Sequence, residues 1–261
     1  MSRIAETFAR LKADGRRGFI PFLTAGDPDL ETTRALIVEL ARAGSTVIEL
    51  GVPFSDPVAD GPVIQRASER ALRRGVGVGD ALEMVAGVRK ETSVPVVLFS
   101  YFNPLMQYGA ARLAADASRA GVDGVLVTDL VPEESEGFSA ALALHGLDQI
   151  FLAAPTTTDE RLRMIAAQAK GFLYAVSRAG VTGARTDLSA DAARLVSRVR
   201  EVTPLPVAVG FGISTPEQVA EVWRYADAAV VGSALVSEIE KCAGRTDLVA
   251  RVGAFARSLI P

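Results

Sequence analysis

The sequence has only one histidine and one cysteine, and this scarcity excludes several common kinds of active site. Cys242 has no second cysteine with which to form an internal disulfide or a multi-cysteine metal site, so we expect it to behave as a small hydrophobic side chain on a helix. His145 falls near the end of a predicted helix, far from the strand ends, so neither a Ser-His-Asp nor a Cys-His arrangement is available. No metal site is predicted.

Lysine is almost as rare, and its positions argue against catalysis through a Schiff base. The predicted helices or their ends contain all four lysines: Lys12, Lys90, Lys170 and Lys241. None of them lies in a predicted strand, where the lysine of a class I aldolase would be expected. The chemistry must therefore depend on carboxylates, on a tyrosine and on backbone donors.

The chain also lacks an excess of charge of either sign. It has 28 basic and 31 acidic residues and a formal net charge of -3, which argues against binding to nucleic acid or to an anionic membrane. No apolar run approaches the ~20 residues needed to span a bilayer. Charged residues at Arg3, Glu6 and Arg10 interrupt the segment that a secretory signal would need. We expect a cytoplasmic protein whose ligand is a small molecule.

Short apolar runs alternate with longer amphipathic segments along the whole chain. The runs are rich in Val, Ile, Leu and Phe, which is typical of parallel strands that are buried on both faces. We predict eight such strands: Phe19–Thr24, Thr46–Leu50, Val94–Phe99, Gly124–Thr128, Gln149–Ala153, Phe172–Val176, Pro206–Gly210 and Ala228–Val231. Leu30–Arg42 is typical of the intervening segments, because its apolar residues form a broad helical face and Gly44 follows as a cap.

A strand and a helix that alternate eight times predict right-handed crossovers and a parallel sheet. In 261 residues, eight units fit a closed (β/α)₈ TIM barrel better than an open doubly wound sheet, which stays as the alternative fold. Ile4, Phe8 and Leu11 precede the first strand and predict an extra N-terminal helix that covers the bottom of the barrel. No linker interrupts the pattern, so we expect a single domain over residues 1–261.

The end of the second strand and the loop that follows it hold three acidic side chains, Glu49 in the strand and Asp56 and Asp60 in the loop. Catalytic groups of such barrels lie at the C-terminal ends of the strands. Glu49 stands in an apolar strand, where burial should raise its pKa towards the range that an acid–base group needs. Alternatively, Glu49 is a structural carboxylate paired with a buried Arg or Lys. Ordinary turn chemistry would also explain Asp56 and Asp60, which precede Pro and Gly.

A second long connection follows the sixth strand at residues 177–186. Its Gly, Ala, Thr and Arg residues are typical of a lid that closes over a bound ligand. A flexible surface loop without a function would have the same composition, so both interpretations stay open.

Two glycine-containing turns predict a phosphate site. The first turn lies at the end of the seventh strand and consists of Gly210, Phe211, Gly212, Ile213 and Ser214, and the second, Gly232 with Ser233, lies at the end of the eighth. Glycine lets backbone N–H groups approach an anion closely, and the N-terminus of a following helix adds a favourable dipole. Barrels recurrently bind phosphate after these two strands. We expect backbone donors to hold the phosphate, so that no lysine is needed.

The chain resembles the tryptophan synthase α family over nearly its whole length, from Pro21–Pro28 to Gly232–Ala234. The most specific segment is Glu49–Pro62, and Tyr101–Pro104 and Ser177–Gly183 add independent support. No position that carries the family's chemistry departs from the pattern. The resemblance implies a TIM-barrel lyase that splits indole-3-glycerol phosphate into indole and glyceraldehyde 3-phosphate, with no cofactor in this chain.

The resemblance also implies individual roles. Glu49 would protonate the indole C3 atom and handle the proton of the glycerol hydroxyl. Asp60 would bond the indole N–H and stabilise the positive charge on the ring, and Tyr174 would assist Glu49. The substrate-binding residues implied in the same way are Phe22, Thr182, Gly183, Phe211, Gly212, Gly232 and Ser233. Among these, Thr182 would close the lid towards Asp60.

A partner follows from the same resemblance. It implies an α₂β₂ assembly with a β subunit that carries pyridoxal phosphate and receives indole through a tunnel. Asp56 and the segment Tyr101–Tyr108, with Asn103 and Pro104, would face that partner. Three alternatives remain: another barrel that acts on a sugar phosphate, a non-catalytic regulatory subunit that binds the ligand, and a free-standing lyase without a β partner.

Overall fold

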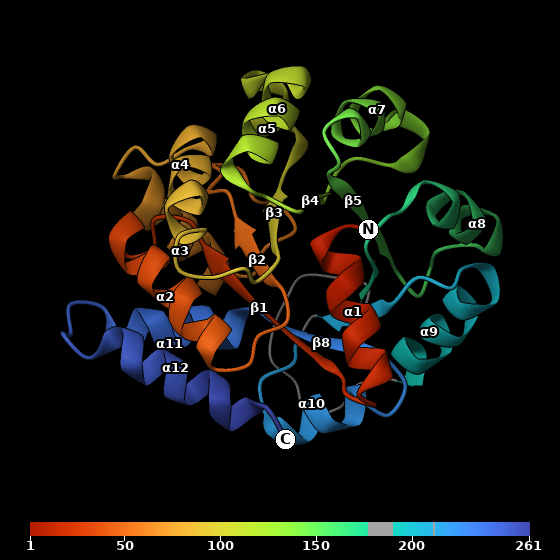
Figure 1. Cartoon of the computed structure of the whole chain (residues 1–261). Helices are drawn as coiled ribbons and strands as arrows, with labels where there is room; N and C mark the ends of the chain where they lie inside the picture. The colour runs from red at the N-terminus through yellow and green to blue at the C-terminus, as the bar shows by residue number, and fades with distance from the viewer. Residues whose placement is uncertain (177–189, 211) are drawn as a thin grey trace.

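Eight parallel strands close into a barrel in their order along the chain (Figure 1). The computed structural model describes residues 1–176, 190–210 and 212–261. The strands are β1 (Gly18–Thr24), β2 (Ile48–Gly51), β3 (Val96–Ser100), β4 (Gly124–Val127), β5 (Asp148–Ala153), β6 (Leu173–Val176), β7 (Val207–Gly210) and β8 (Ala228–Val231). Because β1 pairs in parallel with β8, with Ile20 opposite Val230, the predicted TIM barrel is confirmed and the open sheet is excluded.

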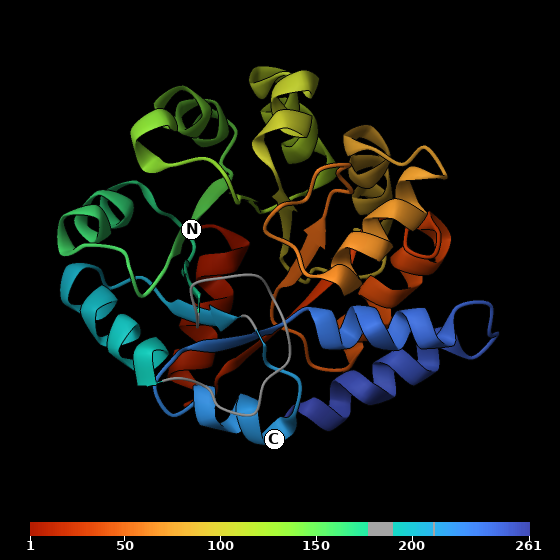
Figure 2. The ribbon, with the colours of Figure 1, turned by 180° about the vertical axis from the view of Figure 1, so that it is seen from behind.

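Helices surround this barrel in views from both sides (Figures 1 and 2). They are α1 (Arg3–Ala13), α2 (Leu30–Arg42), α3 (Pro62–Leu72), α4 (Val78–Val88), α5 (Phe102–Tyr108), α6 (Ala110–Ala120), the short 3-10 helix η1 (Pro132–Glu134), α7 (Glu136–Leu144), α8 (Asp159–Gln168), α9 (Ala190–Val202), α10 (Pro216–Val222), α11 (Ser233–Cys242) and α12 (Leu248–Leu259). The segment Leu30–Arg42 forms the helix that its periodicity predicts.

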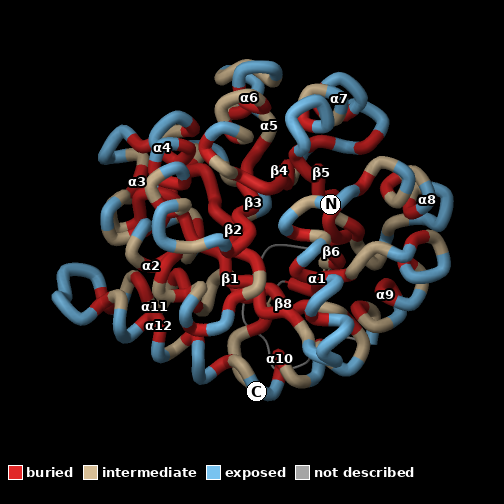
Figure 3. Tube along the Cα trace, viewed as in Figure 1, coloured by how far each residue is buried: buried red, intermediate tan, exposed pale blue. Residues whose placement is uncertain are grey.

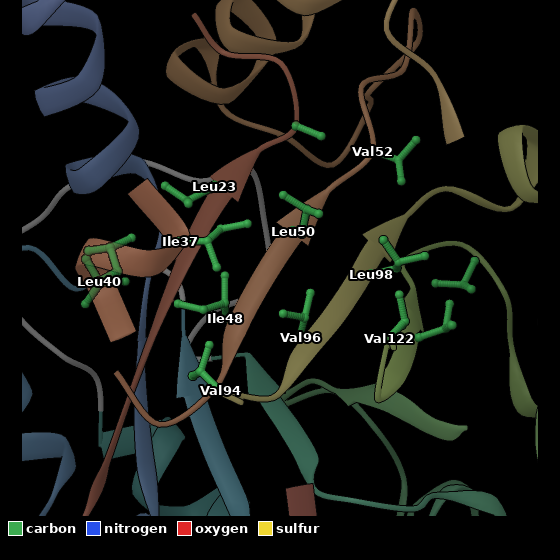
Figure 4. Close-up of a cluster of buried hydrophobic side chains, with 14 of the residues drawn as sticks. Leu23, Ile37, Leu40, Ile48, Leu50, Val52, Val94, Val96, Leu98 and Val122 are labelled. Atoms are coloured by element: carbon green, nitrogen blue, oxygen red, sulfur yellow. The ribbon is translucent and has the colours of Figure 1, made fainter. Parts of the chain in front are cut away.

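The strands are buried on both faces, because nearly all of their residues are buried. Figure 3 shows this as red segments along the barrel. Successive side chains of a strand point to opposite faces of the barrel wall. On β2, Ile48 and Leu50 pack outward in one apolar cluster with Ile37 and Leu40 of α2 (Figure 4). Glu49 lies between Ile48 and Leu50, so its side chain faces the barrel interior.

A second apolar cluster fills that interior, and α1 closes the end of the barrel at which the strands begin. The strands contribute Ile20, Phe22, Val97, Phe99, Leu126, Ile150, Tyr174, Ala208 and Val230, and Phe172 joins them from the position just before β6. Phe8 of α1 lies with its ring 5.7 Å from that of Phe172, and the Arg3 side chain pairs with Asp123 before β4. The extra N-terminal helix is therefore confirmed in the position predicted for it.

Some strands begin later than predicted. Val47 is as buried as the strand residues that follow it, and Val94 is also buried, so an apolar run alone does not mark where β2 and β3 begin. Cys242 is buried on α11, and the exposed His145 ends α7, as expected. Within the described parts of the chain, no helix combines the length and the apolar character needed to cross a bilayer.

Candidate active site

A cavity of about 400 Å³ opens at the C-terminal ends of the strands. Side chains from β1, β2, β3, β6 and β8 form its walls, and the loops after β2, β7 and β8 form its rim. The lining residues are Phe22, Glu49, Asp60, Gly61, Pro62, Val63, Ile64, Phe99, Tyr174, Gly212, Ile213, Ser214, Val230, Gly232, Ser233, Ala234 and Ser237. The cavity therefore joins residues that lie more than 180 positions apart in the chain.

Glu49 is the buried carboxyl at the base of this cavity. Its neighbours across the barrel wall are Phe22 on β1 and Val97 on β3, and only 1% of its surface is exposed. Burial raises the pKa of Glu49 to about 8. Among the described residues, Oε1 of Glu49 has no hydrogen-bond partner, and no basic side chain contributes to the shift of its pKa. The alternative of a structural ion pair with a buried Arg or Lys finds no support in these contacts.

Tyr174 on β6 shares the cavity with Glu49. Burial, and then the negative charge of the nearby Glu49, raise the pKa of Tyr174 well above its usual value. The neighbouring Gly210 on β7 leaves room for this ring, because a Cβ there would lie 1.9 Å from Tyr174 Oη. Gly210 is not among the described residues that line the cavity, and its contact with Tyr174 is by itself enough to require a glycine at this position.

Apolar side chains form a slot within the same cavity as the two carboxyl groups. The ring of Phe22 meets that of Phe99 edge-on, with 5.4 Å between their centroids. Gly51 makes space for Phe22, since a Cβ at that position would lie 2.5 Å from the ring. Ile64 and Val230 complete the apolar wall. A slot of this kind suits a flat aromatic ligand, because ring faces and edges pack well against it.

Asp60 lies on the loop at the opposite side of the cavity from the barrel floor. Burial raises its pKa to about 6, although a hydrogen bond from Tyr101 acts in the opposite direction. The Tyr101 hydroxyl also accepts a hydrogen bond from the Ala59 N–H at 3.0 Å, and Gln65 Nε2 donates to the Asp60 carbonyl at 2.9 Å. These contacts hold the loop in place, so Asp60 belongs both to a turn and to the cavity.

Tyr101 was missed by sequence reasoning as a group that acts on the cavity. Its segment was noticed only as part of the resemblance and as a partner surface. The structure also stacks its ring on that of Phe54, with 5.2 Å between centroids. A tyrosine directly after a strand at this end of the barrel was the available signal.

The other end of the cavity has the character of an anion site. Helix α11 begins at Ser233 with Gly232 as its N-cap, so its unpaired N–H groups and its dipole lie beside the cavity. Gly212 adopts a φ of +85°, a conformation that favours glycine. Ser214 of the predicted turn also lines the cavity, and so do Ala234 and Ser237, which were not predicted as site residues. Ser237 follows Ser233 by one helical turn, and this spacing was the signal for it.

Three of the predicted substrate residues, Thr182, Gly183 and Phe211, lie outside the described residues. The predicted lid, residues 177–186, lies outside them as well.

The predicted partner residues lie away from the cavity lining. Asp56 is exposed on the loop after β2, and Asn103 and Pro104 lie on α5. Two large apolar side chains near them are exposed, Val58 on the loop and Met106 on the helix. Within the described ranges, no group of three or more His, Cys, Asp or Glu side chains could hold a metal ion.

Comparison with known proteins identifies one family. Residues 8–259 match the family described as tryptophan synthase alpha chain. The chain is 54% identical over 241 residues to the tryptophan synthase alpha chain of Geobacter sulfurreducens, covering 92% of this chain and 91% of that protein. It is 51% identical to that of Solibacter usitatus, covering 99% and 97%.

Solved structures agree with this assignment. The tryptophan synthase alpha subunit from Legionella pneumophila superposes with a TM-score of 0.90 at 40% identity, covering 99% of this chain and 97% of that chain. Tryptophan synthase from M. tuberculosis in an aminoacrylate-bound form gives 0.88 at 38% identity, covering 99% and 100%.

Proposed function

The chain belongs to the tryptophan synthase alpha chain family, whose members are indole-3-glycerol phosphate lyases, and we propose that it cleaves this substrate in the cavity between Glu49 and Asp60. The observation that carries the proposal is the pair of carboxyl groups in one apolar cavity with separated pKa values, about 8 for Glu49 and about 6 for Asp60. At neutral pH, Glu49 holds its proton and Asp60 is ionised. Two carboxyl groups in opposite protonation states are suited to acid and electrostatic roles.

The reaction uses one proton from Glu49 and returns one to it. Glu49 donates its proton to C3 of the indole, which gives an iminium cation with its positive charge on the ring nitrogen and C2. The ring can then accept the electron pair of the scissile bond. The Glu49 carboxylate then takes the proton of the glycerol hydroxyl next to the scissile bond. The C–O bond becomes a carbonyl, the C–C bond breaks, and its electron pair returns to the ring as neutral indole. Tyr174, beside Glu49, assists these transfers.

Asp60 stabilises the intermediate cation. Its carboxylate accepts a hydrogen bond from the indole N–H, and the attraction is strong because the cavity is apolar and largely excludes water. The contact from Tyr101 keeps the Asp60 carboxylate on the loop side of the ring. The indole ring occupies the slot formed by Phe22 and its apolar neighbours.

The phosphate binds at the N-terminus of α11. Gly212, Gly232 and Ser233 supply backbone N–H groups and one hydroxyl, together with Gly183 and Phe211 outside the described residues. Binding energy at this end, remote from the reacting carbon, can orient the substrate and drive closure. Thr182 closes the lid towards Asp60 in this proposal.

The proposal extends to the protein's assembly. The chain works as one domain, residues 1–261, in the cytoplasm, and it joins a tryptophan synthase β subunit as α₂β₂. That β subunit carries pyridoxal phosphate and receives the indole. Asp56, Asn103 and Pro104 form part of the contact surface, which is supported by the exposure of Asp56 and Asn103 beside the exposed apolar side chains of Val58 and Met106.

The pH dependence of kcat/KM tests the two carboxyl roles. We expect a bell-shaped profile in the free enzyme, because Asp60 must lose its proton at about pH 6 and Glu49 must keep its proton up to about pH 8. Substrate phosphate also titrates at about pH 6, so the alkaline limb is the diagnostic one. Activity that stays constant from pH 7 to pH 10 would contradict the role of Glu49 as the acid.

Two glycine substitutions separate the ends of the cavity. Gly232→Val has room for its Cβ, 3.6 Å from that of Phe22, and places methyl groups where the phosphate binds. We expect it to raise KM by about 10-fold or more. Gly212→Val should act in the same direction, with added backbone strain. Gly210→Ala should instead displace Tyr174 and lower kcat. Steady-state kinetics measure kcat and KM for all three variants. An unchanged KM for the two valine variants would contradict the proposed phosphate site.

A further inference from the structure

Four charged side chains join α3 to α11 and to the loop after β1, outside the cavity. They are Asp27, Arg66, Arg70 and Glu240, which we call the α3–α11 ion cluster. Arg70 donates to both oxygens of Asp27, at 2.7 and 2.9 Å, and to Oε1 of Glu240 at 2.7 Å. Arg66 binds both oxygens of Glu240, at 2.8 and 2.7 Å. The Arg70–Asp27 and Arg66–Glu240 pairs are therefore both bidentate, and the bond from Arg70 to Glu240 links them. Bidentate contacts fix the orientation of the side chains as well as their distance.

The cluster is partly buried, so it differs from an ordinary surface ion pair. Asp27 is only 2% exposed, the side chains of Arg70 and Glu240 are 26% and 30% exposed, and only Arg66, at 48%, lies largely in solvent. The hydrogen bond from Arg66, with the further contacts to Arg70, lowers the pKa of Glu240 to about 2. Exposed pairs contribute little because water screens them, whereas these side chains are held together by a shared network.

Each element that the cluster joins carries one part of the candidate site. Asp27 follows β1, which holds Phe22. Helix α3 begins at Pro62, two residues after Asp60, and α11 begins at Ser233. The two helices also approach each other at the cavity, where a Cβ on Gly232 would lie 3.9 Å from Ile64 Cδ1. The contact at the cavity end and the cluster further along together set how α3 and α11 lie against each other.

We propose that Arg70 and Glu240 are positioning residues that tie the phosphate end of the cavity to the helix preceded by Asp60. Phosphate bound at the N-terminus of α11 then favours the arrangement in which Asp60 is correctly placed, so phosphate binding raises kcat and does not only lower KM. This inference rests on the proposed function. It concerns energetic coupling between two ends of one site through a packed network.

Glu240→Ala is the informative substitution. It removes the link to α11 but leaves Arg70 paired with the buried Asp27, whereas loss of Arg70 would strand a buried carboxylate. Glu240→Gln keeps a weaker acceptor and should show an intermediate effect. Glu238→Ala is the matched control, because Glu238 lies on the same helix and its ion pair, with Lys241, stays within that helix.

The experiment compares indole-3-glycerol phosphate with indole glycerol, which lacks the phosphate, using the full-length chain. Inorganic phosphate is added in trans with the second substrate. In the wild type and in Glu238→Ala, we expect inorganic phosphate to increase kcat for indole glycerol. In Glu240→Ala, that increase should disappear, and kcat for the phosphorylated substrate should fall by about 10-fold, since small misplacements of catalytic groups are costly. Thermal unfolding of each variant is recorded alongside.

The outcomes are distinguishable. Loss of phosphate activation in Glu240→Ala alone, with partial recovery in Glu240→Gln, supports the inference. A merely structural role would lower stability without changing the ratio of kcat for indole glycerol with and without inorganic phosphate. Equal activation in Glu240→Ala and wild type overturns it, as does a wild type that phosphate does not activate. In both of those cases cleavage of indole-3-glycerol phosphate by the wild type leaves the proposed function standing. A folded wild type that cleaves neither substrate overturns both.

Discussion

Glu49→Gln is expected to fold and to bind indole-3-glycerol phosphate, but to lose cleavage by a factor of at least about 10²–10⁴. The amide has nearly the shape of the protonated carboxyl that the cavity holds at neutral pH, so packing against Phe22 and Val97 is retained. It cannot give a proton to the indole C3 atom or take one from the glycerol hydroxyl. Single-turnover cleavage and a direct binding measurement separate the two effects.

A stability measurement serves as the control for this variant. Burial raises the pKa of Glu49 from 4.5 to about 8, so the folded state binds the proton more tightly than the unfolded state does. Wild-type stability therefore decreases as the pH rises from about 4.5 to about 8, and Gln removes this loss. We therefore compare the unfolding free energy of Glu49→Gln with that of the wild type at two pH values. The difference between variant and wild type should shift in favour of the variant by roughly 3–5 kcal/mol between pH 4 and pH 9.

Wild-type turnover by Glu49→Gln would end the assignment of Glu49 as the acid. A variant that is inactive and also less stable at pH 9 would indicate that Glu49 holds the fold together, which is the structural interpretation that the sequence left open.

Asp60→Asn is expected to lower kcat by about 10²–10³, with a small change in KM. Asparagine can still accept the hydrogen bond from Tyr101 and can follow the same loop geometry. It carries no charge, so it does not stabilise the cation that forms on the indole ring. Because the loss falls on the transition state and not on ground-state binding, kcat and kcat/KM should fall together.

Glu69→Gln is the matched control for Asp60→Asn. Glu69 is an exposed acid on α3 whose ion pair is with Arg73 on the same helix, and its neutralisation changes the local charge by the same amount. Its kinetics should match the wild type. A loss in both variants would point to a general electrostatic effect of this region, and full activity of Asp60→Asn would remove Asp60 from the mechanism.

Much of the barrel could be predicted because parallel strands buried on both faces leave continuous apolar runs in the sequence. The same physics makes Glu49 conspicuous, since a carboxyl between Ile48 and Leu50 has no solvated face available. The first residue of a strand was harder to predict, because an apolar residue before the strand, such as Val47, is buried as deeply as the strand itself.

The parts of the site that escaped prediction depend on contacts between distant segments. The close packing of Gly210 against Tyr174 on the neighbouring strand leaves no room for a side chain at Gly210, and this contact was not predicted. The hydrogen bond from Tyr101 to Asp60 joins the ends of two different loops. The ion cluster of Arg70 joins three elements. Neither spacing nor periodicity encodes such pairings, because they arise only when the barrel closes.

The most direct test of the account is indole release from indole-3-glycerol phosphate by the purified chain, with and without an added β subunit. We predict slow release by the chain alone and a sharp increase when the β subunit is present. Activity that the partner does not change would favour a free-standing lyase. No release under either condition, from a folded protein that still binds the substrate, would contradict the account and leave a ligand-binding regulatory subunit in its place.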